Sequence, residues 1–162
     1  MTPSQTRVAV LGSTGSIGRQ TLDVIRAYPE RFQVVGLSAW NNVGLLAEQV
    51  AEFKPAAVCC ADPSALRERL GGNGPEFTDM TSLACAPEVD VVLAGVVGKG
   101  GLEPVQAALL AGKTVALANK EAMVMAGAIL QAAARTGGGE IRPVDSEHSA
   151  IWQCLAGEER SS

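Results

Sequence analysis

The sequence predicts a doubly wound α/β fold, in which helices cover both faces of a mostly parallel sheet. Short apolar runs alternate along the chain with longer segments of helical periodicity, as expected for strands joined by helical crossovers. The 162 residues include 18 glycines, which mark many tight turns, and 47% are hydrophobic while only 4% are aromatic. The core is therefore expected to consist mainly of Ala, Val, Leu and Ile.

The apolar runs place the expected strands. Each run is short and rich in Val, Leu, Ile or Ala, and most are bounded by glycine or polar residues. The expected strands occupy residues 7–11, 32–38, 57–60, 89–94, 114–118 and 141–144. In an open parallel sheet, ligands bind beyond the carboxyl ends of the strands. A ligand-binding site is therefore expected at the turns that follow these strands.

Helices are expected between the strands. They occupy residues 16–27, 43–53, 63–70, 102–111 and 120–135, and a further helix is expected at 149–155. Pro55 lies beyond the end of the second helix, and Asp62 followed by Pro63 is the pattern of an N-cap and a first-turn proline. Residues 71–75 contain three glycines and a proline and predict a loop.

Length and composition limit the possible functions. A chain of 162 residues is one ordinary domain, which we expect at residues 1–156, with the polar residues 157–162 beginning a connection to a further domain. The net charge of −4 favours neither nucleic acid nor a membrane surface as a partner, and no apolar run reaches the roughly 18 residues that span a bilayer. No signal peptide is expected. The cysteines at 59, 60, 85 and 154 fit no zinc motif, so we expect buried free thiols in a cytoplasmic protein.

A glycine-rich turn follows the first expected strand. Gly12, Gly15 and Gly18 have the spacing G-x-x-G-x-x-G, a variant of the dinucleotide fingerprint of Rossmann-like folds. The first glycine permits the tight turn, the second lets the backbone approach a pyrophosphate, and the third lets the helix pack close to the strand. This position, between a strand and an amphipathic helix, favours nucleotide binding over a purely structural turn.

The turn after the second expected strand indicates which nucleotide, NAD or NADP, the site would prefer. Sites that prefer NAD usually have an acidic residue here for the ribose 2′-hydroxyl, but this turn contains Trp40, Asn41 and Asn42. A 2′-phosphate would not be repelled, so NADP is favoured, with the two asparagines as neutral donors. Trp40 is either a partly buried aromatic residue of the turn or a stacking partner for adenine.

Two further groups of polar residues follow the last expected strands. Asn119 could cap the helix at 120–135, and Lys120 and Glu121 would stand at the mouth of the crevice unless they are a solvated surface pair. In an extended segment Asp145 and Glu147 would point to the same side and could chelate Mg²⁺ or Mn²⁺.

Other roles are open for the residues around this acidic pair. The carboxylates could instead serve as helix caps, and Ser146 could cap the next helix. His148 is the only histidine, and strand alternation would point it away from both carboxylates. A structural or second-shell role is therefore expected for it.

Taken in order, the motifs of this chain resemble those of 1-deoxy-D-xylulose 5-phosphate reductoisomerases. The resemblance is carried by Gly12 to Gly18 with Thr-Leu-Asp-Val behind it, by Leu-Ala-Asn-Lys-Glu-Ala at 117–122, and by Pro-Val-Asp-Ser-Glu-His at 143–148. It implies an NADPH-dependent enzyme that uses Mg²⁺, Mn²⁺ or Co²⁺ to convert a sugar phosphate into 2-C-methyl-D-erythritol 4-phosphate in isoprenoid biosynthesis. It also implies that the full enzyme is a homodimer and that each of its chains is more than twice as long as this one. This chain would be the cofactor domain and would be inactive alone.

The resemblance assigns roles to individual residues. It implies cofactor contacts at Gly12, Thr14, Gly15, Ser16, Ile17, Trp40, Asn41, Asn42, Asn119 and Glu121. It implies metal ligands at Asp145 and Glu147, substrate contacts at Lys120, Ser146 and Glu147, and catalytic roles for Lys120 and Glu147. A third metal-binding glutamate and the phosphate-binding residues have no counterpart in this chain. Several relatives have Gly-Lys-Asn where this chain has Trp40, Asn41 and Asn42.

Other functions fit the residues less well. A short-chain reductase needs a Tyr-x-x-x-Lys pair, but the only tyrosine, Tyr28, has Phe32 four residues later. A noncatalytic NADP(H)-sensing module would explain the glycine turn. It would give no reason for Lys120, Asp145 and Glu147 to gather at one edge of the sheet.

Overall fold

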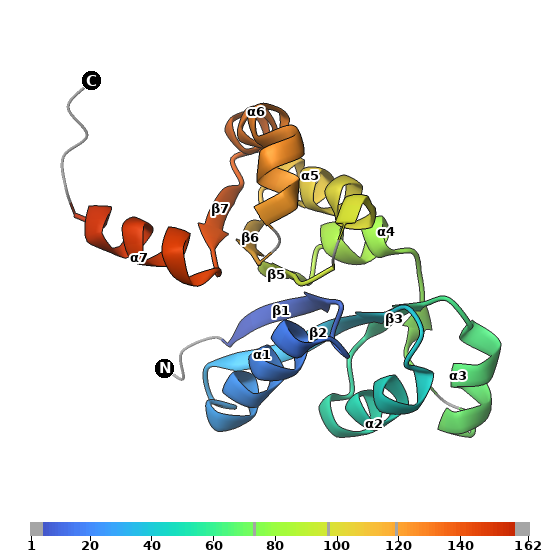
Figure 1. The fold of residues 1–162 in the computed structure, drawn as a ribbon. Coiled ribbons are helices and arrows are strands. Elements are labelled where there is room, and N and C mark those ends of the chain that lie inside the picture. The colour runs from blue at the N-terminus through green and yellow to red at the C-terminus, as the bar shows by residue number, and fades with distance from the viewer. Residues whose placement is uncertain (1–4, 73, 97, 119, 158–162) are drawn as a thin grey trace.

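The computed structural model describes residues 5–72, 74–96, 98–118 and 120–157. Within them the strands form one parallel sheet in the order β4-β3-β2-β1-β5-β6-β7, with helices on both faces (Figure 1). The strands are β1 (Thr6–Leu11), β2 (Phe32–Ala39), β3 (Ala57–Cys60), β4 (Glu76–Phe77), β5 (Val91–Ala94), β6 (Thr114–Leu117) and β7 (Glu140–Pro143). The predicted fold class is confirmed.

The helices alternate with these strands. They are α1 (Ser16–Ala27), α2 (Val43–Phe53), α3 (Pro63–Leu70), α4 (Met80–Cys85), α5 (Leu102–Leu110), α6 (Lys120–Gly137) and α7 (Ser146–Leu155), with a 3₁₀ turn η1 (Gly98–Gly101) before α5. The strand order runs outward from β1 to β4 and then restarts beside β1 with β5. This reversal is the point where doubly wound sheets open a crevice for a ligand.

The two faces of the sheet bury separate cores because neighbouring residues of a strand point to opposite faces. Val8 and Val10 of β1 belong to the core that includes α1, α2 and α3, whereas Ala9 and Leu11 belong to the core that includes α4, α5 and α6. Figure 1 shows these two sets of helices on opposite sides of the sheet. The central strands β1, β2 and β5 are buried on both faces, which explains their nearly continuous apolar sequences.

The parallel register brings the strand ends into one row. Neighbouring strands pair at their carboxyl ends through Cys59, Ser38, Leu11, Ala94, Leu117 and Pro143, in that order across the sheet. Gly12, Trp40, Lys120 and Asp145 each lie within three residues of a member of this row. The segments that the sequence singled out therefore start from one edge of the sheet, as expected.

The structure also departs from the sequence-based expectations. Strand β4 and helix α4 were not expected, because two and six residues are too short to show a periodicity, although Asp79 caps α4 by accepting the Ser82 N–H at 2.9 Å. Helix α7 begins at Ser146 rather than at 149, and β5 begins at Val91 rather than at 89. The expected helices 16–27, 43–53 and 63–70 are confirmed.

The cysteines are free, but they are less buried than expected. Cys59, Cys60 and Cys85 are half-buried, and this burial raises the pKa of each thiol. Cys154 is exposed on α7, so the expectation of a buried thiol is wrong there. None of the helices described is long and apolar enough to cross a membrane. The expected connection at 157–162 lies almost wholly outside the described residues.

An ion pair fastens the amino end of β1 to the segment that enters β5. The Asp90 carboxylate accepts the Arg7 backbone N–H at 2.9 Å, its Nε–H at 3.0 Å and its Nη2–H at 2.7 Å. Hydrogen bonding to the Arg7 guanidinium lowers the pKa of Asp90, with a smaller contribution from the Arg7 charge. Both side chains are 41% exposed, so solvent screening limits the contribution to stability.

The variant Asp90→Asn should lower the free energy of unfolding at pH 7 by about 1 kcal/mol, because it loses the charge-assisted bonds to Arg7. The folded state lowers the Asp90 pKa below its ordinary 3.8, so the stabilisation is complete above pH 3.8 and disappears as the pH falls through the lower folded value. Urea denaturation from pH 7 to pH 2 measures this.

The matched control is Asp23→Asn, which removes an exposed partner of Arg26 within α1. It should change the free energy of unfolding by less than about 0.5 kcal/mol. A difference between wild type and Asp90→Asn that stays constant down to pH 2 would contradict the assigned linkage.

Candidate nucleotide and metal site

The glycine turn between β1 and α1 is fixed by backbone bonds to β2. The N–H groups of Gly12 and Ser13 both donate to the Ser38 carbonyl, at 3.1 and 2.8 Å, and Gly12 has a φ of +81° that favours glycine. Gly15 is the N-cap of α1 and has no side chain to cap the first turn. The N–H groups at the start of this 12-residue helix are therefore suited to an anion such as a pyrophosphate.

The third glycine lets α1 approach the turn closely. A Cβ atom at Gly18 would lie 2.3 Å from the Gly12 carbonyl oxygen and 2.6 Å from the Ser13 Cα. No real Cβ atom is tolerated at such distances from backbone, so this position requires glycine. Of the expected cofactor contacts in the turn, Gly15 and Ser16 are exposed, and Gly12, Thr14 and Ile17 are half-buried.

The turn after β2 is exposed at the same edge of the sheet. Trp40 is 69% exposed, so the interpretation as a partly buried turn aromatic is wrong, and its ring is accessible to a ligand. Asn42 caps α2 by accepting the Leu45 N–H at 3.1 Å, which leaves its amide NH₂ as the donor group. Asn41 is exposed beside it.

The start of α6 meets the turn after β5. The Glu121 carboxylate accepts the Gly98 N–H at 3.0 Å, and this bond ties α6 to η1. Lys120 is exposed at the first position of α6. The expected cap and cofactor contact Asn119 lies outside the described residues.

The acidic motif forms a helix start rather than an extended segment. Asp145 is the N-cap of α7: its Oδ1 accepts the His148 N–H at 2.9 Å, and Oδ2 lies 2.7 Å from the His148 Nδ1. Glu147 lies in the first turn and accepts the Ser146 hydroxyl at 2.8 Å. The expected alternation of Asp145 and Glu147 along a strand is therefore wrong, as are the Ser146 cap and the outward direction of His148. The strand had already ended at Pro143.

The local hydrogen bonds favour the ionised form of both carboxyl groups. The His148 side chain, followed by its backbone N–H, lowers the pKa of Asp145, and the positive charge of Lys120 adds to this effect. The Ser146 hydroxyl and a backbone N–H lower the pKa of Glu147, against an opposing contribution from the Asp145 charge. The Lys120 charge therefore favours the ionised form of both carboxyl groups.

A divalent cation fits this motif only in part. The two ionised carboxylates supply the oxygen ligands that Mg²⁺ and Mn²⁺ prefer. No group of three or more His, Cys, Asp and Glu side chains in the described residues could hold a metal ion. The motif therefore offers part of a coordination shell.

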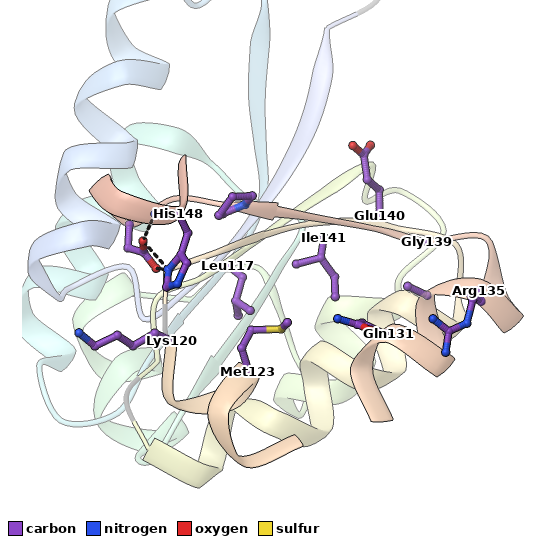
Figure 2. A pocket seen from close by; sticks show the side chains of 12 residues that line it. Leu117, Lys120, Met123, Gln131, Arg135, Gly139, Glu140, Ile141 and His148 are labelled. Atoms are coloured by element: carbon purple, nitrogen blue, oxygen red, sulfur yellow. Dashed lines mark hydrogen bonds and ion pairs between the residues drawn. The ribbon is translucent and has the colours of Figure 1, made fainter. Parts of the chain in front are cut away.

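A groove of about 590 Å³ lies beside this motif, between α6, β7 and α7. Figure 2 shows Lys120 and His148 at one end of it, Arg135 and Glu140 toward the other, and Leu117, Met123 and Ile141 between them. This volume is in the range of small-molecule sites. No local sequence pattern predicts this groove, because its lining comes from four elements, β6, α6, β7 and α7, that pack together only in the folded chain.

Together, these features define a Rossmann-like nucleotide-binding domain: a glycine turn after the first strand, an exposed turn without acids after the second, and a reversal of the strand order beside β1. Residues 8–127 match the family model described as 1-deoxy-D-xylulose 5-phosphate reductoisomerase. The chain belongs to the 1-deoxy-D-xylulose 5-phosphate reductoisomerase family.

Individual relatives agree with this assignment. A 1-deoxy-D-xylulose 5-phosphate reductoisomerase of Pelotomaculum thermopropionicum is 50% identical over 158 residues, which cover 93% of this chain and 41% of the relative. The solved structure of the Zymomonas mobilis enzyme with NADPH is 41% identical, with a TM-score of 0.87 over 93% of this chain and 41% of that one. A related structure in complex with magnesium is 37% identical, with a TM-score of 0.88 over 94% and 40%. The chain thus spans about two fifths of the length of these relatives.

The variant Gly18→Ala should destabilise the protein by about 1 to 3 kcal/mol, because the new methyl group would overlap the Gly12 carbonyl and push α1 away from the turn. The control is Gly44→Ala in α2, where the nearest atom is the Asn42 Oδ1 at 3.9 Å. It should be neutral or stabilising by up to about 1 kcal/mol. Thermal unfolding of both variants measures the difference, and equal melting temperatures would contradict the close approach.

Proposed function

We propose that this chain is the NADPH- and metal-binding part of a 1-deoxy-D-xylulose 5-phosphate reductoisomerase that produces 2-C-methyl-D-erythritol 4-phosphate. The main support for the proposal is that the carboxyl ends of the strands lie in one row. The glycine turn, the Lys120 segment and the acidic motif therefore all begin at one edge of the sheet. Related reductoisomerases have been solved in complex with NADPH and with magnesium, which supports the same ligands here. The family resemblance also supports a homodimer in the cytoplasm, with residues 1–156 as the cofactor domain.

The cofactor would lie along the carboxyl edge of the sheet. Gly12, Thr14, Gly15, Ser16 and Ile17 would hold the pyrophosphate, because the turn offers backbone N–H groups at a helix start. Trp40, Asn41 and Asn42 would meet the adenosine end, and Asn119 and Glu121 the nicotinamide end. From β1 the acidic motif is three strands away, or about 15 Å at the usual strand spacing. The nicotinamide half would extend in that direction.

Asp145 and Glu147 would hold Mg²⁺, Mn²⁺ or Co²⁺ as two ligands of a larger shell. When bound, the cation supplies Lewis-acid activation of the substrate's carbonyl and hydroxyl oxygens, and NADPH supplies the reducing equivalent. His148 and its backbone N–H keep Asp145 ionised and fix its orientation. Lys120 and Ser146 would bind the sugar phosphate, with Lys120 placing a positive charge near both carboxylates.

NADPH should bind this chain at least about tenfold more tightly than NADH. The turn after β2 contains no carboxylate to repel the 2′-phosphate, and Asn41 and Asn42 offer neutral donors. Titration followed by the fluorescence of the reduced nicotinamide measures both dissociation constants. Equal affinities for the two nucleotides would contradict the cofactor assignment, and binding of neither would contradict the proposed function.

The variant Asp145→Asn should weaken Mn²⁺ binding by about tenfold or more, since it removes one of two anionic ligands. Asparagine still caps a helix, so α7 should form normally. The matched control is Asp62→Asn, which makes the same change at the cap of α3 and should leave Mn²⁺ binding unaltered. Electron paramagnetic resonance of free Mn²⁺ gives the affinities. Equal binding by both variants would exclude Asp145 as a ligand.

A further inference from the structure

A buried polar pair lies directly beneath the glycine turn. The Ser13 hydroxyl donates to the Gln49 Oε1 at 2.7 Å, and the Gln49 Nε2 donates back to the Ser13 carbonyl at 3.0 Å. Ser13 is fully buried and Gln49 is 5% exposed, so neither bond competes with bulk water. A buried amide left without a partner costs about 1 to 3 kcal/mol, so the two residues depend on each other.

The pair connects the two segments proposed to hold opposite parts of the nucleotide. Ser13 is a residue of the glycine turn, and Gln49 lies on α2, the helix that Asn42 caps at its start. On the other side, the Ser38 carbonyl at the end of β2 accepts the Ser13 N–H at 2.8 Å. Ser13 is therefore held from two directions by the strand and the helix that flank the Trp40 turn.

Stability alone does not require these groups to be polar. An apolar pair of the same shape can replace a buried hydrogen-bonded pair at little or no cost in stability. Among the described residues, no buried side-chain nitrogen or oxygen lacks a hydrogen-bond partner, so this pair is one part of a fully satisfied interior. What the polar pair adds is direction, because two bonds of opposite sense fix the orientation of the Ser13 peptide.

We propose that Ser13 and Gln49 are positioning residues for the cofactor. They fix the glycine turn relative to α2, so that the N–H groups of Thr14, Ser16 and Ile17 and the turn at 40–42 bind one nucleotide at the same time. Preorganised donors lose no affinity to rearrangement on binding. The inference rests on the proposed function, because it assumes that the turn binds a pyrophosphate.

Ser13→Ala removes one bond of the pair and Gln49→Met removes both, and either change should free the glycine turn from α2 and weaken NADPH binding by about tenfold. Binding of adenosine 2′-monophosphate should change by less than about twofold, because this ligand has the 2′-phosphate but no pyrophosphate. The decisive result is that the affinity for NADPH falls while the affinity for adenosine 2′-monophosphate does not. A general loss of structure would lower both affinities. Calorimetric titration gives both dissociation constants.

The variant Gln20→Met is the matched control, because it makes the same change at an exposed glutamine of α1. It should leave the affinity for NADPH unchanged. The double variant Ser13→Ala/Gln49→Met should bind NADPH about as weakly as either single variant, because the two residues act as one unit. Ser13→Ala leaves the bond from the Gln49 amide to the Ser13 carbonyl in place, so it tests the inference even if Gln49→Met does not fold.

Three results would overturn the inference. Folded variants could bind NADPH as tightly as the parent chain, the two ligands could weaken by the same factor, or the double variant could lose the sum of the two single effects. Failure of the parent chain itself to bind NADPH is a different result, because it would first contradict the proposed function. Circular dichroism establishes that each variant is folded.

Discussion

The parallel register of the sheet is the constraint on which the rest of the structure depends. Leu11 pairs with Ser38 on one side and with Ala94 on the other, and the same row continues through Leu117 to Pro143. A shift of one residue in any pair would send buried side chains to the wrong face of the sheet. Because the separate cores on the two faces forbid that shift, they also fix the points from which the functional turns begin.

The sequence was sufficient for the fold because local pattern and tertiary structure agree over most of the chain. Strands buried on both faces give nearly continuous apolar runs, and the caps Asp62 and Asn42 precede the helices they begin. The sequence was insufficient at 145–148, where two local rules compete. Alternation along a strand predicts two carboxylates on one side. Instead, the Asp145 carboxylate accepts a hydrogen bond from the His148 N–H and caps the start of a helix. The groove beside this motif depends on the packing of four elements, so no local sequence pattern predicts it.

The buried pair of Ser13 and Gln49 shows a second limit of sequence patterns. Gln49 lies between buried positions of α2 and would be expected to interrupt an apolar face, while Ser13 resembles any small residue of a glycine turn. Only their contact, across 36 residues of sequence, reveals that each satisfies the other. The role of such polar residues depends on tertiary structure. A buried polar group without a partner lowers stability, whereas a buried hydrogen-bonded pair fixes the orientation of both groups.

The two halves of the proposed site are built in different ways. The nucleotide half rests on buried elements: α1 packs on the sheet through Leu22 and Ile25, and the turn is held by backbone bonds to β2. The metal half lies at the start of α7, which has no buried residue and meets β7 partly through the Arg142 guanidinium 5.9 Å from the Trp152 ring. The proposed cofactor would therefore meet a surface that packing and backbone bonds hold in place, whereas the proposed metal half has little such support. In the proposed metal half, Asp145 and Glu147 would supply two ligands, and the substrate and other groups would supply the remaining oxygens of the coordination shell.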